Sequence, residues 1–332
     1  MGGICRMAGM VEPEMMESSN DIALIGAANV DLVMRLDEPM LPGLSNPAEM
    51  TLRIGGAARN IAACLARLGQ RPLLLSAFAD DADGAAIAGD AGRMGVDLIN
   101  LSGGQGRTSR YIAALDPEGR LSVAFNDMGI HEQAAALDGD AMARAMTCRW
   151  WLADANLSSA LLESLILTEG RPPVAVAGVS VAKVVRLAGL LDRIDLLLLN
   201  QREAEALLRQ EESAESLDAA ARLANDLLAK GPSIVAVTAG AAGAALGLEG
   251  ITYRAGARTD CEMADCVGAG DGFAAGVLAS LLRGEVAETW LLRGNAAASL
   301  VVESDQAAPE TLDWPAVESR AGDITVTRDD AE

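Results

Sequence analysis

Histidine and aromatic residues are scarce in this chain of 332 residues. Phenylalanine, tryptophan and tyrosine together make up 3% of it, and His131 is the single histidine. Histidine-rich metal sites are therefore excluded, and any Ser-His-Asp chemistry would have to run through this one residue. His131 stands in the polar stretch Gly-Ile-His-Glu-Gln, which we interpret as a solvated loop.

Paired cysteines and long apolar runs are also missing. The five cysteines are odd in number and include no Cys-x-x-Cys pair, so a reduced compartment fits better than a disulfide framework. The apolar stretch 174–199 is interrupted by five charged residues, and we expect no membrane-spanning segment. The N-terminus lacks the basic-then-apolar pattern of a signal peptide. These features predict a soluble, cytoplasmic protein.

Positive charge is in short supply. Lys and Arg total 26 against 47 Asp and Glu, which gives a formal net charge of −21. Such a surface repels nucleic acid and anionic membranes, so we expect neither as a partner, and any phosphate ligand needs a locally electropositive pocket. Apolar material is abundant: hydrophobic residues make up 51% of the chain, enough for a packed core.

Short apolar runs alternate with Ala- and Leu-rich segments of helical spacing. The runs are 22–26, 73–78, 174–177, 196–199 and 234–238, and the helical segments are 57–69, 84–95, 158–169, 182–191, 201–209 and 214–230. This alternation predicts an α/β fold with a doubly wound, mostly parallel sheet flanked by helices. We expect residues 1–20 to be a flexible leader, 21–308 one domain and 309–332 an acidic C-terminal tail.

Two stretches interrupt the alternation. Residues 31–54 and 107–126 contain shorter and more polar strand-like pieces. The pieces around Asp116-Pro117-Glu118-Gly119 should form a hairpin, because this is a good β-turn sequence. We predict that both stretches form a small β-sheet lid, through which a homodimer would form.

The most informative segment is Asp265-Cys266-Val267-Gly268-Ala269-Gly270-Asp271-Gly272, which opens an apolar helix running to about residue 282. Small residues let backbone N–H groups approach a phosphate, and the helix N-terminus adds partial positive charge. Asp271 is then either a general base beside an anion hole, suited to phosphoryl transfer, or an ordinary N-terminal carboxylate. Taken alone, the segment favours neither interpretation.

Four further segments place glycines and polar residues where ligands bind in doubly wound folds. Three follow predicted strands: Gly26-Ala27-Ala28-Asn29-Val30-Asp31, Asn200-Gln201-Arg202-Glu203 and Thr238-Ala239-Gly240-Ala241-Ala242-Gly243. The fourth, Gly55-Gly56-Ala57-Ala58-Arg59-Asn60, precedes a helix, and its glycines would let a ligand come close to Asn60. Singly, each is also compatible with an ordinary turn.

Together and in this order, the five segments resemble the ribokinase-like (PfkB) family of sugar and nucleoside kinases from about Asp21 to Glu303. The resemblance implies that Asp271 is the catalytic base and that Gly268, Ala269 and Gly270 form the anion hole. It assigns the substrate hydroxyls to Asn29, Asp31, Gly55, Gly56 and Asn60. It assigns the Mg²⁺–phosphate network to Asn200 and to Glu203, acting through water, and the ATP site to Thr238, Gly240, Gly243 and Asn295.

The chain departs from the family pattern in two places. Cys266 replaces the usual threonine beside Asp265, where the resemblance implies a monovalent-cation (K⁺) site. Phe78-Ala79-Asp80-Asp81 lacks the glycine of the usual Gly-x-Asp. Neither change removes the implied base or anion hole.

Segments in the substrate half narrow the resemblance to pseudouridine kinases. They are 45–47, 55–62, 65–69, 126–128, 153–157 and 179–183. The implied activity is ATP-dependent phosphorylation of the 5′-hydroxyl of free pseudouridine, with Asn126, Asp154 and Asn156 as candidates for binding the base and Lys183 as support. The alternatives are another sugar or nucleoside kinase of the family and a non-catalytic ligand-binding regulator on the same fold.

Overall fold

Ten strands form the main sheet of the computed structural model, which describes residues 20–133, 136–137, 139–258 and 268–330. Their order is β14-β13-β12-β11-β10-β9-β8-β1-β4-β5; the strands from β11 to β5 run parallel, and β12, β13 and β14 are antiparallel. The strands are β1 (Ile22–Ile25), β4 (Pro72–Ser76), β5 (Asp97–Asn100), β8 (Trp150–Asp154), β9 (Val174–Ala177), β10 (Leu196–Asn200), β11 (Ile234–Thr238), β12 (Ala244–Leu248), β13 (Ile251–Ala255) and β14 (Val326–Asp330). The predicted α/β class with a mostly parallel sheet is confirmed.

The apolar runs form strands here because both faces of the sheet are covered. In β1, Ile22 and Leu24 belong to one hydrophobic cluster, whereas Ala23 and Ile25 belong to another. Successive side chains of a strand point to opposite faces, so a strand buried on both sides must be apolar throughout.

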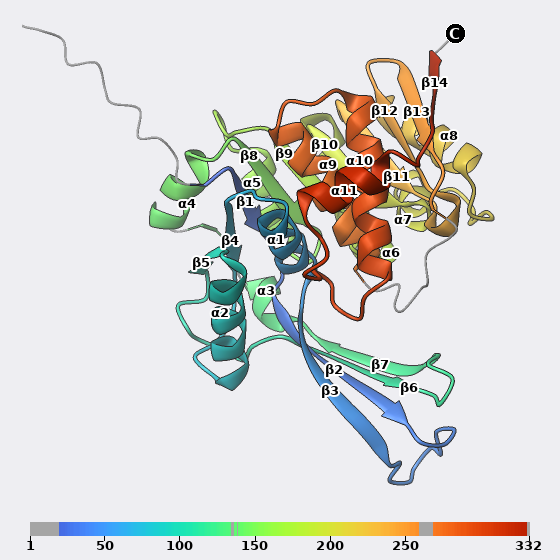
Figure 1. Cartoon of the computed structure of the whole chain (residues 1–332). Helices are drawn as coiled ribbons and strands as arrows, with labels where there is room; N and C mark the ends of the chain where they lie inside the picture. The colour runs from blue at the N-terminus through green and yellow to red at the C-terminus, as the bar shows by residue number, and fades with distance from the viewer. Residues whose placement is uncertain (1–19, 134–135, 138, 259–267, 331–332) are drawn as a thin grey trace, which may run out of the picture.

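Helices cover the two faces of the sheet (Figure 1). One group is α1 (Ala57–Arg67), α2 (Ala82–Met94), α9 (Ala269–Leu282), α10 (Ala287–Val302) and α11 (Trp314–Ala321). The other is α4 (Gly139–Met146), α5 (Ser159–Ile166), α6 (Val181–Val184), α7 (Gln201–Leu208) and α8 (Leu217–Leu228). None of the helices in the described ranges is both long and apolar enough to cross a membrane.

The segment 182–191, predicted as one helix, is not continuous. It forms α6 and the 3₁₀ turns η1 (Val185–Leu187) and η2 (Leu191–Arg193). Val181, Val184 and Val185 are β-branched and Gly189 lies inside the segment, and both residue types weaken a helix.

The segment predicted as an acidic tail contributes to the main body. Its residues form α11 and β14, and β14 pairs with β13 at the edge of the main sheet. Leu312 and Val317 are buried in the core, and the guanidinium of Arg283 lies 4.2 Å from the ring centroid of Trp314. Of the predicted leader, only Asn20 lies within the described residues.

A second sheet of four strands projects from the main body (Figure 1). Its order is β3-β2-β6-β7, built from β2 (Asn29–Leu36), β3 (Ala48–Gly55), β6 (Arg110–Leu115) and β7 (Leu121–Asp127). The predicted turn joins β6 to β7, and the Gly119 N–H donates to the Asp116 carbonyl at 2.9 Å. This is the predicted small sheet, called the lid below.

The two faces of the lid differ in chemistry. Register places Asp31, Arg53, Tyr111 and Asn126 in one row across the strands, and Leu32, Leu52, Ile112 and Phe125 in the next row. Adjacent rows point to opposite faces of a sheet. The lid therefore has a polar face and an apolar face.

Candidate active site

The first strand of the lid carries two of the predicted hydroxyl ligands. Asn29 is buried, and its Nδ2 donates to Asp31 Oδ1 at 2.5 Å. Burial raises the pKa of Asp31 to about 6, although the Asn29 bond and the charges of Arg59 and Arg53 act in the opposite direction. Asp31 is thus largely ionised at neutral pH and can accept a hydrogen bond from a hydroxyl.

Two glycines let the lid and α1 meet close to this carboxylate. A Cβ atom on Gly55 would lie 2.2 Å from Asp31 Oδ2, and one on Gly56 would lie 2.3 Å from the Ala27 carbonyl oxygen. Gly56 also has a φ of 102°, a conformation that favours glycine. The Gly-Gly pair therefore has a steric cause at the junction of β3 and α1.

Asn60 and Asp271 are brought together from positions 211 residues apart in the chain. Asn60 Nδ2 donates to Asp271 Oδ2 at 2.9 Å. Burial raises the pKa of Asp271 to about 7; the Asn60 bond and Arg59 lower it, while the Asp154 and Glu203 carboxylates raise it further. A carboxyl group with a pKa near neutrality is suited to general-base catalysis.

Asp271 lies in the first turn of α9, directly after Gly268-Ala269-Gly270. Gly268 is the N-cap residue with φ of 86°, and within the described residues no side chain caps this helix end. Helix N-termini present backbone N–H groups and partial positive charge to an anion. Asp265 and Cys266, implied to lie at a cation site, fall outside the described residues.

A cavity of about 180 Å³ extends from Asp271 to the ends of β10 and β11. Asn200, Glu203 and Thr238 line it, together with Gly268 and Gly270 of the predicted anion hole. Asn200 and Thr238 are register partners on neighbouring strands, which explains why these motifs meet.

The Asn-x-x-Glu motif also caps a helix. The Glu203 N–H donates to Asn200 Oδ1 at 2.9 Å, and the Asn200 N–H donates to Glu203 Oε2 at 3.0 Å. Burial raises the pKa of Glu203 despite these bonds. The cap thus holds one buried carboxyl group at the wall of the 180 Å³ cavity, which is called the smaller cavity below.

That wall fits a magnesium ion carried by a nucleotide. Mg²⁺ in kinases is usually held by one or two carboxylates together with phosphates and water. Glu203 offers one carboxylate beside the anion hole. In the described ranges no cluster of three or more His, Cys, Asp or Glu residues is placed to hold a metal by itself.

The remaining nucleotide candidates lie beyond β11. Gly240 and Gly243 belong to the turn around η3 (Gly240–Ala242) and have φ values of 51° and 113°. Asn295 is buried on α10, and its Nδ2 donates to the Ala255 carbonyl at 3.2 Å. Its amide therefore holds the end of β13 in this structure.

The candidates for binding the base are split between two places. Asn126 is exposed on the polar face of the lid. Asn156 is buried and accepts a hydrogen bond from Lys183 Nζ at 2.5 Å. The fully buried Asp154 accepts from the backbone N–H groups of Ala27 at 2.8 Å and Ala58 at 3.1 Å, so it braces the turn after β1.

The interpretation of His131 as a solvated loop residue is wrong. It lies on α3 (Gly129–Gln133) and is 1% exposed, and its neighbour Ile130 packs against Ala77 and Ala79. Burial lowers the pKa of His131, although Asp154 raises it. A single apolar neighbour in a five-residue helix is too weak a pattern to reveal this burial.

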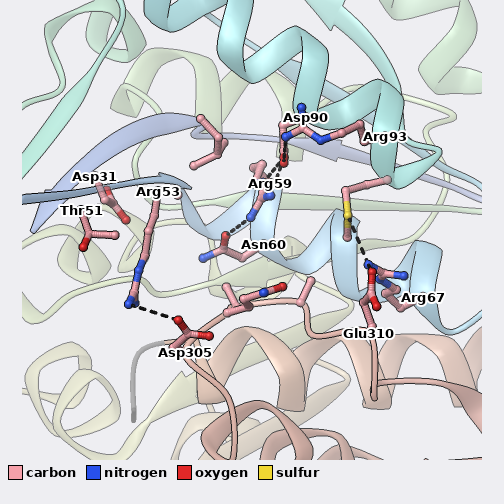
Figure 2. A pocket seen from close by; sticks show the side chains of 16 residues that line it. Asp31, Thr51, Arg53, Arg59, Asn60, Arg67, Asp90, Arg93, Asp305 and Glu310 are labelled. Carbon is pink, nitrogen blue, oxygen red and sulfur yellow. Dashed lines mark hydrogen bonds and ion pairs between the residues drawn. The ribbon is translucent and has the colours of Figure 1, made fainter. Parts of the chain in front are cut away.

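A larger cavity of about 720 Å³ lies on the other side of Asn60 (Figure 2). Asp31, Gly55 and Asn60 line it, and so does Arg53 from the polar face of the lid. Binding sites for small molecules usually measure about 300–1,000 Å³. Three of the predicted hydroxyl ligands, Asp31, Gly55 and Asn60, thus face a space large enough for a nucleoside, and Asn60 connects it to Asp271 by a hydrogen bond.

The sequence analysis predicts no role for two residues of this site. Arg59 lies between Asp90 and Asn60 (Figure 2), and the only signal for it was its place directly before Asn60. Val179 lines the smaller cavity with a φ of 69°, which is unusual for a β-branched residue and has no sequence signal.

Comparisons with known proteins agree with this geometry. The profile of the family described as "pfkB family carbohydrate kinase" matches residues 19–314. Pseudouridine kinase from Escherichia coli (strain K12) is 33% identical over 198 residues, which are 58% of this chain and 62% of that protein, less than two thirds of its length. Guanosine-inosine kinase from Exiguobacterium acetylicum is 29% identical over 312 residues, 89% of this chain and 99% of that protein.

Solved structures show the same fold. A carbohydrate kinase from Agrobacterium tumefaciens superimposes with a TM-score of 0.81 at 28% identity, covering 93% of this chain and 99% of that one. Ribokinase from Arabidopsis thaliana, complexed with ribose and ATP, gives a TM-score of 0.80 at 22% identity, covering 91% and 98%.

Proposed function

The chain belongs to the pfkB family of carbohydrate kinases, and from this premise we propose that it transfers a phosphoryl group from ATP to the 5′-hydroxyl of free pseudouridine. One observation supports the transfer above all. Asp271, with a pKa of about 7, lines the smaller cavity together with Gly268 and Gly270, and it is hydrogen-bonded to Asn60, which lines the larger cavity together with Asp31 and Gly55. In the proposed complex the acceptor hydroxyl and the phosphate approach each other at this hydrogen-bonded pair.

In the proposed reaction Asp271 accepts the proton of the 5′-hydroxyl as that oxygen attacks the γ-phosphorus, while the bond from the γ-phosphorus to the β,γ-bridging oxygen breaks and ADP leaves. The Asn60 hydrogen bond orients the carboxylate for this role. Backbone N–H groups at Gly268, Ala269 and Gly270 stabilise the negative charge of the transferring phosphoryl group. Thr238, Gly240 and Gly243 hold the nucleotide beyond them.

Magnesium would neutralise part of the charge on the nucleotide phosphates. Glu203 is the residue that would hold it, through water, because its carboxyl group lies in the wall of the smaller cavity. Asn200 keeps Glu203 in place through the helix cap.

The choice of pseudouridine depends on the edge of the base. Pseudouridine and uridine share the ribose, but the C-glycosidic link of pseudouridine leaves an additional ring N–H exposed. Asn126 on the polar face of the lid and Asn156 after β8 are the candidate acceptors, and Lys183 orients Asn156. Uridine would leave such an acceptor unpaired, which costs about 1–3 kcal/mol.

The test is kcat/KM for pseudouridine, uridine, ribose, guanosine and inosine at the same ATP and Mg²⁺ concentrations. We expect pseudouridine to exceed uridine by about 10- to 100-fold, the equivalent of that energy. Equal values for the two, or a preference for ribose, would contradict the pseudouridine proposal and leave the family assignment intact.

A second candidate is a purine nucleoside kinase. The alignment with guanosine-inosine kinase covers 99% of that protein, whereas the alignment with pseudouridine kinase covers 62%. Higher kcat/KM for inosine or guanosine than for pseudouridine would favour this candidate, and no turnover of any acceptor would favour a non-catalytic regulator.

We also propose that two copies of the chain associate through the apolar face of the lid. Leu52 is 55% exposed and Phe125 is 62% exposed, and they belong to the same row of that face. Neighbouring exposed apolar side chains on one sheet face are typical of association surfaces.

A further inference from the structure

We propose that Arg59, anchored by Asp90, is a positioning residue that fixes the orientation of the catalytic carboxylate through Asn60. The proposal rests on the role of Asp271 as the general base. It concerns two residues, one on α1 and one on α2, that the family signatures leave unassigned.

A chain of hydrogen bonds joins four side chains from three helices. Arg59 Nε donates to Asp90 Oδ2 at 2.8 Å, and Arg59 Nη2 donates to the same oxygen. Arg59 Nη1 donates to Asn60 Oδ1 at 3.0 Å, and Asn60 Nδ2 donates to Asp271 Oδ2 at 2.9 Å. Figure 2 shows Arg59 lying between Asp90 and Asn60.

Arg59 decides which end of the Asn60 amide faces the base. An asparagine amide has an accepting oxygen and a donating NH₂ group, whereas a guanidinium can only donate. The Arg59 bond therefore keeps Oδ1 on its own side and turns Nδ2 towards Asp271. A reversed amide would place its oxygen against the carboxylate with no proton between them.

The pair is built into the fold. The Arg59 and Asp90 side chains are each 11% exposed, so neither is a loose surface group. A guanidinium held in this way presents its donors in one fixed geometry, because the planar fork binds a carboxylate and a second acceptor at once.

Charge supports the same role. Among the described residues, the charged neighbours acting on Asp271 are Asp154 from β8 and Glu203 from α7, which raise its pKa, and Arg59, which lowers it. Cys64 of α1 is also close, but burial raises the pKa of its thiol and keeps it neutral. Arg59 is the one cation among these neighbours, so its removal should leave Asp271 harder to ionise.

The experiment compares Arg59→Met, Arg59→Lys and Arg171→Met in the full chain. Arg171 Nη1 donates to Asp195 Oδ2 at 2.9 Å and its side chain is also 11% exposed, but neither Arg171 nor Asp195 lines either cavity, so Arg171→Met is the matched control. The kcat of each variant is measured against pH with the best acceptor from the nucleoside and sugar panel.

For Arg59→Met we expect kcat at pH 7 to fall by about 10- to 100-fold, and the acidic limb of the profile to move up by about one pH unit. Arg59→Lys keeps the positive charge but lacks the planar guanidinium. The acidic limb of its kcat–pH profile should therefore stay near the wild-type position, while kcat falls by about 3- to 10-fold. Arg171→Met should match the wild type in both. A purely structural role would change melting temperature or KM and leave the limb in place.

A second readout needs no turnover. The titration of Asp271 is followed by NMR of ¹³C-carboxyl-labelled aspartate, with Asp271→Asn assigning the signal. If no acceptor is phosphorylated, the proposed function fails, but this titration still tests whether Arg59 acts on Asp271 through Asn60. An unshifted Asp271 titration in folded Arg59→Met overturns the proposal, and if that variant does not fold, wild-type kcat in Arg59→Lys overturns it.

Discussion

At Asp271, function and stability are in conflict. Its carboxyl group is buried beside the Asp154 and Glu203 carboxylates, and its pKa is about 7. The ordinary pKa of an aspartate in an unfolded chain is about 3.9. Folding therefore favours the protonated form, and this contribution to stability is present below pH 4 and lost as the pH rises through about 7.

Replacing Asp271 by asparagine should separate the two effects. We expect Asp271→Asn to lower kcat by about 10²–10⁴ because the general base is lost. The variant cannot ionise, so at pH 8 it should be more stable than the wild type, by at most about 4 kcal/mol for a shift of about three pKa units. Unfolding by urea at pH 4 and pH 8, with kcat in parallel, measures both.

The wild type supplies the matching control. Its kcat should rise with pH through about 7, as the base ionises. Wild-type turnover in folded Asp271→Asn would return Asp271 to the role of an ordinary carboxylate at a helix N-terminus.

The lid is the element whose arrangement matters most. Its polar face carries Asp31 and Arg53, which line the larger cavity, and its strands have few partners outside their own sheet. A small sheet attached at one end can change its angle to the body at low cost, since it breaks few buried contacts. Closure over a substrate would exclude water from the reacting groups.

We predict that nucleoside binding slows amide exchange in the lid. With pseudouridine and a non-hydrolysable ATP analogue present, β2, β3, β6 and β7 should exchange several-fold more slowly, because closure protects their hydrogen bonds. Hydrogen-exchange mass spectrometry measures this, and α8, on the far face of the sheet, serves as the internal control. Equal exchange in all four lid strands with and without ligands would contradict closure.

For the molecule as a whole, charge limits where two copies can meet. With a net charge of −21, copies repel one another over most of their surface. The apolar face of the lid carries Leu52 and Phe125 exposed, and contact there would bury apolar area without bringing acidic groups together.

A charge placed on that face should therefore prevent dimer formation. We expect Leu52→Asp to weaken the dimer by about 100-fold or more, because an unpaired carboxylate would be buried at the contact. Sedimentation velocity over a range of concentrations measures the effect. Val286→Asp is the control, since Val286 is 68% exposed at the N-cap of α10, away from the lid. A wild type that stays monomeric, or a Leu52→Asp variant that stays dimeric, would contradict the proposed interface.

The sequence by itself determined the α/β class, five of the ten main-sheet strands (β1, β4, β9, β10 and β11), the lid strands and the glycine-rich segment before Asp271. These features depend on patterns within about ten residues: apolar runs buried on both faces, glycines at steric junctions and polar pieces around a turn. The same reasoning identified Asn60 and Asp271 individually, each inside a short motif.

Only the tertiary structure decided which of these residues act together. The Asn60–Asp271 bond spans 211 residues, Arg59 meets Asp90 across two helices, and His131 is buried although its stretch of sequence is polar. The C-terminal segment joins the main sheet because β13 offers it an edge, despite its acidic composition. Burial and long-range hydrogen bonding depend on which distant segments pack together, and the local spacing of residues carries no record of that.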